Sequence, residues 1–547
     1  MKFSNPKTGR LIGACALSLL VLAQGLILMP YAGLQNDEAL FGSLIYEPRH
    51  LDHPIQVFKR RIPLMAISYL GGLKAWLYAI WFELWPPSIS SVRLPVVCAG
   101  ALSVWLFARL LRQIAGSRAA WIGGLLLASD TSFVLLTTFD WGPVALQHLL
   151  LLGALNSLLA FHRSGRQRWL ALAFFLFGLA FWDKTVFAWM FTGLAIASLA
   201  LLRCEIRRAV SPRQVALAAL ALLVGASPLI LYNARSGGAT LRQARLDFSD
   251  LPGKAHQLRS TLEGSSLFGY LTREDDGRSR LDPPTTLERA ALALSDLAGR
   301  PRRSVLPFAL LLSLLSLPLL TRSAQRALLL PALAMGIAWL QMALIQGAGG
   351  SAHHAVLLWP LPHWMVAVAL ADLSSRLACG RHLATFALAG TIAVKSLLVT
   401  NEYLAQFIRH GPGPYWTDAM EPLARRLLAL RAGAVVIADW GILDSVRLLS
   451  QGRLPLFQAI DLASRTELDP REQASLRWLL ELPDPVFAGY ARHEQAVRSA
   501  GLRLAAHAAG LGYRKDTVDF VADRHGRPVF EIWRFRPISD PGPRQPR

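Results

Sequence analysis

The sequence predicts a polytopic α-helical membrane protein that carries a C-terminal soluble α/β domain. Of its 547 residues, 53% are hydrophobic and only 17% are charged, whereas soluble domains carry roughly 25% charged residues. Charge is also unevenly distributed: residues 1–400 contain 37 basic and 19 acidic residues, and residues 401–547 contain 20 and 17. The first segment is too apolar for a soluble domain. We therefore expect a transmembrane domain over 1–400 and a soluble domain over 401–547.

Eleven apolar stretches are long enough, or nearly long enough, to cross about 30 Å of hydrocarbon. They lie at residues 11–33, 93–112, 119–137, 143–162, 168–183, 186–202, 214–233, 304–320, 327–346, 356–375 and 383–400. The first stretch has no small-residue cleavage site and continues directly into the fold, which favours a permanent anchor over a signal peptide. We therefore expect about eleven transmembrane helices.

A twelfth apolar stretch, residues 63–82, decides which side of the membrane every later loop faces. If it does not cross, the N-terminus and the short loops on the same side hold 17 basic residues and one acid, Glu205. Basic residues in short loops favour the cytoplasmic side. We therefore predict that residues 63–82 form outer-face juxtamembrane structure. The N-terminus then lies inside and the C-terminus outside the cytoplasmic (inner) membrane.

Two long loops, residues 34–92 and 234–303, lie on the outer side in this topology. Loops of this length in a compact domain are usually functional. The tail outside the membrane has the pattern of an α/β domain. Its expected strands lie at 434–438, 486–490, 518–522 and 529–535, and its expected helices lie at 442–450 and near 493–509.

Charge distribution and cysteine positions argue against nucleic-acid binding and against cysteine-based sites. The net charge of +21 does not indicate nucleic-acid binding, because much of the excess lies in short loops between apolar stretches. All four cysteines lie in or beside apolar stretches, so neither a disulfide framework nor a cysteine metal site is expected. The cysteines are Cys15, Cys98, Cys204 and Cys379.

Ionisable side chains gather at the outer ends of the expected spans and form a candidate site. They are Asp37 and Glu38 after the first span, Asp140 after the third, Lys184 at the turn between the fifth and sixth, and His353 and His354 at the start of the tenth. Carboxylates there can accept a hydroxyl proton or bind a divalent cation, and a lysine can bind phosphate. The alternative is that these residues are solvated interfacial acids, a snorkelling lysine and hydrogen-bonded histidines.

The order of these motifs resembles the GT-C integral-membrane glycosyltransferases. The motifs are NDEALFG after the first span, SVRLPVVCAG at the second, TTFDWGPV after the third and LAFWDKTVF at the fifth-to-sixth turn. The chain is most similar to the bacterial family 39 and 83 type, which includes protein O-mannosyltransferases and the aminoarabinose transferase that acts on lipid A. Recognisable motifs cover residues 11–200, and residues 300–400 are similar only in architecture.

The resemblance implies an enzyme that moves a sugar from a polyprenyl-phosphate donor, with inversion, to an acceptor on the outer face of the membrane. The acceptor can be a lipid, a glycan or a protein. By this analogy Asp37 and Asp140 are the catalytic acids and Lys184 contacts the donor phosphate. The aminoarabinose transferases carry a Lys-Pro-Pro motif that this chain lacks, so lipid A modification is not favoured. Lys59 and Arg60 are the expected substitutes for its phosphate contact.

In the expected mechanism Asp37 takes the proton of an acceptor hydroxyl. Asp140 and Glu38 orient the acceptor or, with Asp37, hold a divalent cation, which is the one cofactor considered. His353 and His354 complete the expected substrate-binding set.

The competing class is a polytopic lipid or glycan transporter or flippase. Against it, the sequence shows no two-fold repeat and no charged residues in the middle of matching spans. A scaffold protein that acts through its tail is a second alternative. The tail has no glycine-rich phosphate loop, no Ser-His-Asp set and no metal-ligand spacing.

Overall fold

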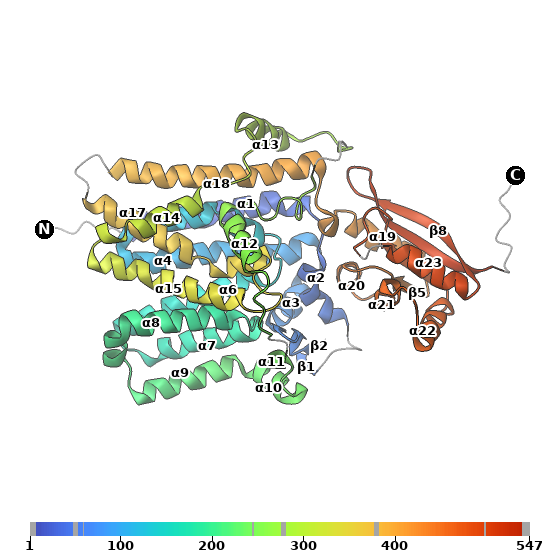
Figure 1. Cartoon of the computed structure of the whole chain (residues 1–547), viewed down its shortest axis with the longest axis horizontal. Coiled ribbons are helices and arrows are strands. Elements are labelled where there is room, and N and C mark those ends of the chain that lie inside the picture. Colours follow the sequence, from blue (N-terminus) through green and yellow to red (C-terminus); the bar gives the residue numbers. More distant parts are fainter. Residues whose placement is uncertain are drawn as a thin grey trace.

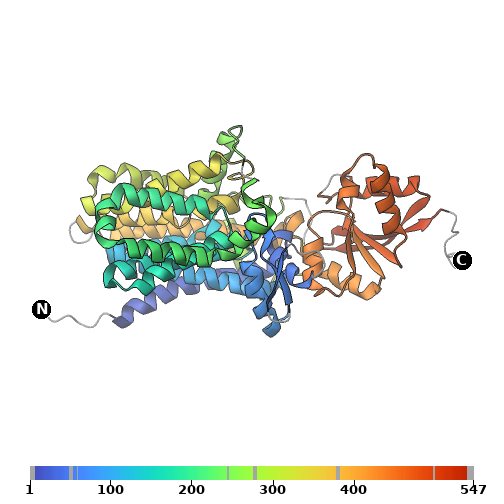
Figure 2. The same ribbon diagram turned by 90° about the horizontal axis from the view of Figure 1, so that it is seen from below.

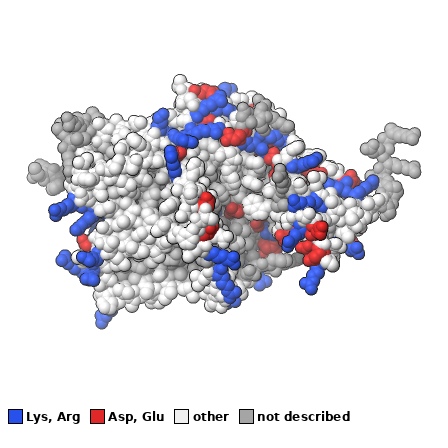
Figure 3. Space-filling view, in the orientation of Figure 1, with Lys and Arg blue, Asp and Glu red and all other residues white. Residues whose placement is uncertain are grey.

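The structure is a computed structural model that describes residues 7–47, 53–57, 60–242, 245–274, 280–376, 382–496 and 499–538. A bundle of long helices forms one end of the molecule and an α/β domain forms the other (Figures 1 and 2). Between them lies a layer of short helices and strands that includes those of residues 34–92 (Figure 1). The bundle surface is largely uncharged, with basic residues at the end far from the α/β domain (Figure 3).

The long helices of the bundle cover all eleven apolar stretches. They are α1 (Lys7–Leu28), α4 (Ile89–Ser129), α6 (Val144–Ser164), α7 (Gln167–Asp183), α8 (Phe187–Ala209), α9 (Pro212–Gly225), α10 (Ser227–Ser236), α14 (Leu306–Leu315), α15 (Arg322–Ala343), α17 (Leu361–Arg376) and α18 (His382–His410). By length and apolar composition, five helices of the described residues qualify as membrane spans, or up to eight if each bent pair is one span. The polytopic helical membrane architecture is confirmed, and the count of eleven stays a prediction.

Helix α4 consists of two antiparallel arms rather than one straight rod. Gly116 has a φ of +85°, a backbone conformation that glycine adopts at little cost, and the chain reverses there. A Cβ atom at Gly123 would collide with Leu111, and one at Gly100 would lie 2.9 Å from Thr137 Cβ. Such contacts are impossible along a straight helix, which rises 1.5 Å per residue. The spans expected at 93–112 and 119–137 therefore pack side by side, with α5 (Thr131–Leu136) continuing the second arm.

Residues 34–92 form the layer at the end of the bundle. Helix α2 (Asn36–Ser43) leaves α1 at an angle of 97°. The layer also contains β1 (Pro54–Val57), β2 (Arg60–Pro63), β3 (Met65–Ile67), β4 (Leu70–Gly71) and α3 (Leu73–Leu84). A helix of 12 residues is about 18 Å long, too short to cross the hydrocarbon core. That residues 63–82 do not cross the membrane stays a prediction.

The α/β domain contains a five-stranded sheet in the order β6-β5-β7-β9-β8. Its strands are β5 (Ala434–Ile437), β6 (Leu456–Gln458), β7 (Pro485–Tyr490), β8 (Tyr513–Ala522) and β9 (Pro528–Pro537). Strand β5 runs parallel to β6 and β7, whereas β9 runs antiparallel to β7 and β8. Its helices include α19 (Met420–Leu430), α20 (Leu443–Leu449), α22 (Pro470–Leu480) and α23 (Ala500–Gly510). The boundary expected after residue 400 falls inside α18, and β6 and α22 were not expected from the sequence.

The α/β domain packs directly on α2 through α20. The Ser43 hydroxyl donates to Asp444 Oδ1 at 2.6 Å, and the Ser445 hydroxyl donates to the Leu34 carbonyl at 3.0 Å. Leu448 lies in the same buried apolar cluster as Phe41 of α2. The short helix that carries the first acidic motif is therefore held between the bundle and the domain.

Glycine contacts hold α7 against α9, and they generate a stability prediction. A Cβ atom at Gly178 would collide with the Leu222 carbonyl oxygen, and one at Gly225 would collide with the Phe175 carbonyl oxygen. Neither backbone can move without separating the helices. We expect Gly178→Ala to destabilise the protein by roughly 1–3 kcal/mol, the usual cost of overpacking, measured by thermal unfolding in detergent.

Gly336→Ala in α15 is the matched control, because a Cβ there meets no atom within 4 Å. Alanine also has the higher helix propensity by about 1 kcal/mol, so this variant should melt at or above the wild-type temperature. A Gly178→Ala protein as stable as Gly336→Ala would contradict the packing described.

Candidate functional site

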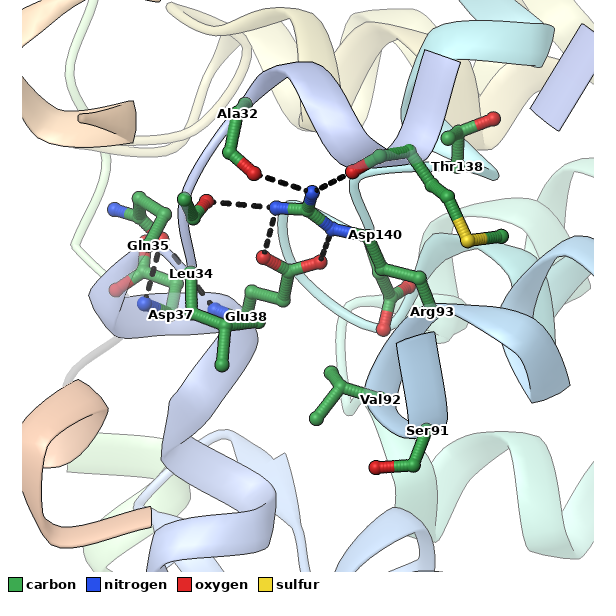
Figure 4. Close-up of polar contacts among 12 residues, drawn as sticks. Ala32, Leu34, Gln35, Asp37, Glu38, Ser91, Val92, Arg93, Thr138 and Asp140 are labelled. Carbon is green, nitrogen blue, oxygen red and sulfur yellow. Dashed lines mark hydrogen bonds and ion pairs between the residues drawn. The ribbon is translucent and has the colours of Figure 1, made fainter. Parts of the chain in front are cut away.

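A buried ion pair fixes the chain between the first span and α2. Arg93, near the start of α4, donates from Nε and Nη2 to the two carboxylate oxygens of Glu38, each at 2.7 Å. Its remaining N–H groups donate to the carbonyls of Met29, Ala32 and Gly33 at 2.5–2.7 Å. Both side chains have 0% exposure, and all five guanidinium donors are used (Figure 4).

This arrangement differs from the substrate contact expected for Glu38. Both of its oxygens are occupied by Arg93 and its side chain has no exposed surface, so Glu38 holds the fold of the loop instead. From the sequence, Arg93 was noted only as part of the motif SVRLPVVCAG, with no role assigned to it. An arginine at the start of an apolar stretch is the signal that would have indicated a buried carboxylate partner.

Asp37 stands one residue before this ion pair and is presented differently. The Gln35 side chain caps α2 by accepting hydrogen bonds from the backbone N–H groups of Asp37 and Glu38, at 2.6 and 3.4 Å. The Asp37 carboxylate accepts a hydrogen bond from Trp141 Nε1 at 3.2 Å. Burial raises the pKa of Asp37 above its ordinary value, against the opposing effects of Trp141 and of the positive charge on Lys184. A partly desolvated carboxylate of this kind can accept a proton from a bound hydroxyl.

Asp140 lies in a buried ion pair with Lys74 of α3. Its backbone has a φ of +45°, a conformation that aspartate tolerates better than most residues. The Lys74 ammonium also lies 4.8 Å from the ring centre of Phe41. Asp140 therefore ties helix α3 to the turn after the third expected span. Lys74 was not expected at the site, although a lysine inside an otherwise apolar stretch is a signal for such a pair.

Lys184 lies at the tight turn between α7 and α8, which residues 64–71 hold in place. The Thr185 N–H donates to the Tyr69 carbonyl at 3.0 Å, and Lys184 pairs with Leu70 in an isolated antiparallel bridge. Trp182 Nε1 donates to the Leu64 carbonyl at 2.8 Å. Gly71 allows this approach, because a Cβ atom there would collide with the Trp182 carbonyl.

The Lys184 ammonium is buried, at 1% residue exposure, and has no hydrogen-bond partner among the described residues. Burial lowers the pKa of Lys184 to about 8, and the negative charges of Asp183 and Asp37 oppose that shift. Asp183 accepts a hydrogen bond from Gln147 Nε2 at 2.7 Å. An ammonium group without hydrogen bonds is costly when buried. An anionic ligand that brought oxygen atoms to Lys184 would remove this cost.

His353 and Lys184 both lie close to Gly142, and Trp141 packs on His353. A Cβ atom at Gly142 would lie 3.2 Å from Lys184 Nζ and 3.4 Å from His353 Cδ2. The Trp141 ring lies 4.3 Å from His353 and stacks on Tyr270 at 4.5 Å.

His353 and His354 occupy the short helix α16 (Ala352–Ala355), with ring centres 4.1 Å apart. Burial lowers the pKa of His353 well below its ordinary value and that of His354 to about 3. Both histidines are therefore neutral near pH 7.

The structure brings together only some of the residues expected at the site. Asp37, Lys184 and His353 surround the Trp141–Gly142 turn, whereas Glu38 and Asp140 have their own cationic partners. The three carboxylates therefore do not fit a shared cation, and the described residues include no group of three or more His, Cys, Asp or Glu side chains that could hold a metal. Lys59 lies outside the described residues, and Arg60 begins β2 with its side chain outside them.

Comparison with known proteins agrees with the motif order. The family model described as dolichyl-phosphate-mannose-protein mannosyltransferase matches residues 73–232. This segment contains Lys74, Arg93, Asp140 and Lys184. No curated protein sequence matches the chain.

Solved structures show the same fold over nearly the whole chain. ArnT from Cupriavidus metallidurans, bound to undecaprenyl phosphate, has a TM-score of 0.56 and 14% identity, with 96% of this chain and 98% of that chain covered. Its apo form has a TM-score of 0.57 at the same identity and coverage. An Archaeoglobus fulgidus oligosaccharyltransferase tethered to an acceptor peptide has a TM-score of 0.52 and 16% identity, with 92% and 71% covered. The resemblance to the GT-C membrane glycosyltransferases that the motifs predict is therefore confirmed.

Proposed function

We propose that the protein transfers a sugar from a polyprenyl-phosphate donor to an acceptor hydroxyl on the outer face of the cytoplasmic membrane. The observation that carries this proposal is the buried Lys184 ammonium, which has no hydrogen-bond partner among the described residues and stands beside the Asp37 carboxylate. A cation for a phosphate and a base for a hydroxyl are the two groups that this reaction needs. The reported complex of ArnT with undecaprenyl phosphate supports the same class of donor.

In this mechanism the acceptor oxygen attacks the anomeric carbon while the bond between that carbon and the donor phosphate oxygen breaks. The electron pair of the broken bond stays on the phosphate, and Lys184 stabilises the charge that develops there. Asp37 accepts the acceptor proton. One displacement of this kind inverts the anomeric centre.

Arg93, Glu38, Lys74 and Asp140 act as positioning residues in this proposal. They fix α2 and α3, so that Asp37 and the Lys184 turn face the same space. Asp140 therefore supports the site from an ion pair rather than touching the sugar. His353 and His354, neutral at physiological pH, offer hydrogen bonds to donor or acceptor without adding charge.

The acceptor enters beside the α/β domain. The ring centres of Tyr270 and Tyr415 lie 6.1 Å apart, and those of Tyr415 and Trp440 lie 5.8 Å apart. Trp440 follows β5. The domain thus borders the same space as Asp37, where a lipid, a glycan or a protein can be presented.

The decisive assay is sugar transfer from a polyprenyl-phosphate sugar by the purified full-length protein in membranes. A covalent glycosylated product supports the enzyme. Movement of the lipid-linked sugar across the membrane without any product would support the transporter or flippase instead.

The proposed orientation in the membrane predicts on which side residue 88 and the C-terminus lie. Reporter fusions after residue 88 and at residue 547 should both report the outer side, because the arginine-rich ends of the spans stay inside. A cytoplasmic signal at residue 88 would mean that residues 63–82 cross the membrane. Lys184 and Asp37 would then lie on opposite sides, and the proposed site would not exist.

Asp37→Asn should reduce turnover roughly 10²–10⁴-fold, the usual contribution of a positioned general base. The amide keeps the size of the side chain but cannot accept the proton. Asp37→Glu should recover little activity, because the added methylene displaces the carboxylate. Both variants should reach wild-type levels in membranes.

Glu38→Gln is the matched comparison, since it makes the same chemical change at the next residue. It leaves Arg93 buried without its carboxylate, so it should lower the amount of folded protein more than the turnover of each folded molecule. Wild-type turnover in Asp37→Asn would show that Asp37 is not the general base.

Lys184→Ala should weaken use of the donor strongly, whereas Lys184→Arg should restore part of it because charge is retained. The pH profile tests the same role. In the wild type, kcat/KM should rise as Asp37 loses its proton and fall above about pH 8 as Lys184 loses its own. An arginine stays protonated, so Lys184→Arg should lack the alkaline fall.

Lys395→Ala, which removes an exposed lysine from α18, serves as the control for lost charge. It should retain wild-type kinetics and the wild-type pH profile. Equal donor use in wild type and Lys184→Ala would contradict binding of the donor phosphate by Lys184.

A further inference from the structure

A second site lies at the end of the bundle far from the α/β domain. A cavity of about 600 Å³ opens there between α1, the two arms of α4 and the end of α6. Its lining includes Arg109, Arg112, Arg163, Gln113, Trp105 and Trp121. A second cavity, of about 480 Å³, runs along α1 and α4 and shares Trp105 with the first. We infer that the two cavities together bind an anionic phospholipid, with its phosphate in the basic cavity and an acyl chain in the apolar one.

The residue spacing on α4 separates the two halves of this site. Leu102, Trp105, Arg109 and Arg112 follow one another at intervals of three or four residues, so they share one face of the helix. With a rise of 1.5 Å per residue, Leu102 and Arg112 lie about 15 Å apart along the axis. This face of α4 is therefore apolar at Leu102 and basic at Arg112. Their separation is roughly that between the acyl chain of a phospholipid and its phosphate.

The basic cavity has charge that the protein does not neutralise. Among the described residues, no carboxylate forms an ion pair with Arg109, Arg112 or Arg163. Arg163 donates to the Gln113 carbonyl at 3.0 Å, and Gln113 donates to Asn156 at 3.2 Å, which joins α6 to the first arm of α4. The Arg109 guanidinium lies 5.6 Å from the Trp105 ring centre. The three arginines are exposed and lie around one cavity, where a phosphodiester can accept their hydrogen bonds.

The apolar cavity has the lining expected of a groove for a lipid chain. Its residues come from α1 and from the first arm of α4 and include Leu19, Leu22, Ala101 and Leu102. Leu19 and Leu102 are 60% and 45% exposed in the protein alone, which suits side chains that face hydrocarbon. A ligand that fits both cavities carries an apolar chain and a negative charge at one end. Free phosphate lacks the chain, and a neutral phospholipid lacks the net charge.

This inference does not depend on the proposed transfer reaction. The cavity is lined by residues around Gly116, where the two arms of α4 meet, whereas α2, which carries Asp37, lies at the end of the bundle next to the α/β domain (Figure 1). Failure of one proposal therefore leaves the other standing.

The test uses the full-length protein in a neutral detergent and measures lipid binding by native mass spectrometry. Phosphatidylglycerol should bind at least 10-fold more tightly than phosphatidylcholine with the same acyl chains. Arg109→Gln combined with Arg112→Gln should weaken phosphatidylglycerol binding roughly 30-fold, the effect of losing two arginines beside an anionic headgroup. Leu102→Trp should also weaken it, because the larger ring fills the apolar groove while every charge is kept.

Arg207→Gln combined with Arg208→Gln is the matched control, since both residues are exposed on α8 and line neither cavity. This variant should bind phosphatidylglycerol within about two-fold of wild type. Equal losses in the two double variants would show that binding follows overall charge and would overturn the site. Displacement of phosphatidylglycerol by inorganic phosphate alone, or equal binding of phosphatidylcholine, would overturn it as well.

Discussion

The buried pair of Arg93 and Glu38 is the interaction on which the arrangement of the site depends. Burying two charges is expensive unless their hydrogen bonds are complete, and here the guanidinium uses all five N–H groups. Three of them bind carbonyls at the end of the first span and the start of the next loop. The bend of 97° between α1 and α2 is thus fixed by a residue of α4. Asp37 reaches its position because its neighbour in the sequence cannot move.

The charges at this end of the bundle are mostly neutralised in pairs, and Lys184 is an exception that favours a ligand role. Arg93 pairs with Glu38, and Lys74 pairs with Asp140. The Lys184 ammonium remains, close to carboxylates but without a hydrogen bond among the described residues. A structural lysine would be expected to have its donors satisfied, as Lys254 does with the carbonyls of Ala343 and Ile345 at 2.7 and 2.9 Å. This contrast favours a ligand role for Lys184 over a purely structural one.

The α/β domain borders the site as well as extending from it. Helix α20 packs on α2, and the rings of Tyr270, Tyr415 and Trp440 follow one another from the bundle to the carboxyl end of β5. Ligands of α/β sheets commonly bind outside the carboxyl ends of parallel strands. In the proposed reaction the sheet edge of the domain borders the space where the acceptor would meet Asp37, so a change in the domain should alter acceptor choice without touching the donor phosphate.

The sequence by itself determined the membrane helices, and it predicted the outer-face placement of residues 63–82 and Asp37 and Lys184 as candidates. These features depend on local properties, namely the length of apolar runs, the positions of basic residues and motif order. Tertiary structure decided which acid stays available: Glu38 and Asp37 are neighbours in the chain, yet only Glu38 meets Arg93. It also decided that Lys74 pairs with Asp140, and that the two arms of α4 pack so closely that Gly100 meets Thr137. The physical reason is that a charged group finds its partner through space, and hydropathy along the chain carries no information about that distance.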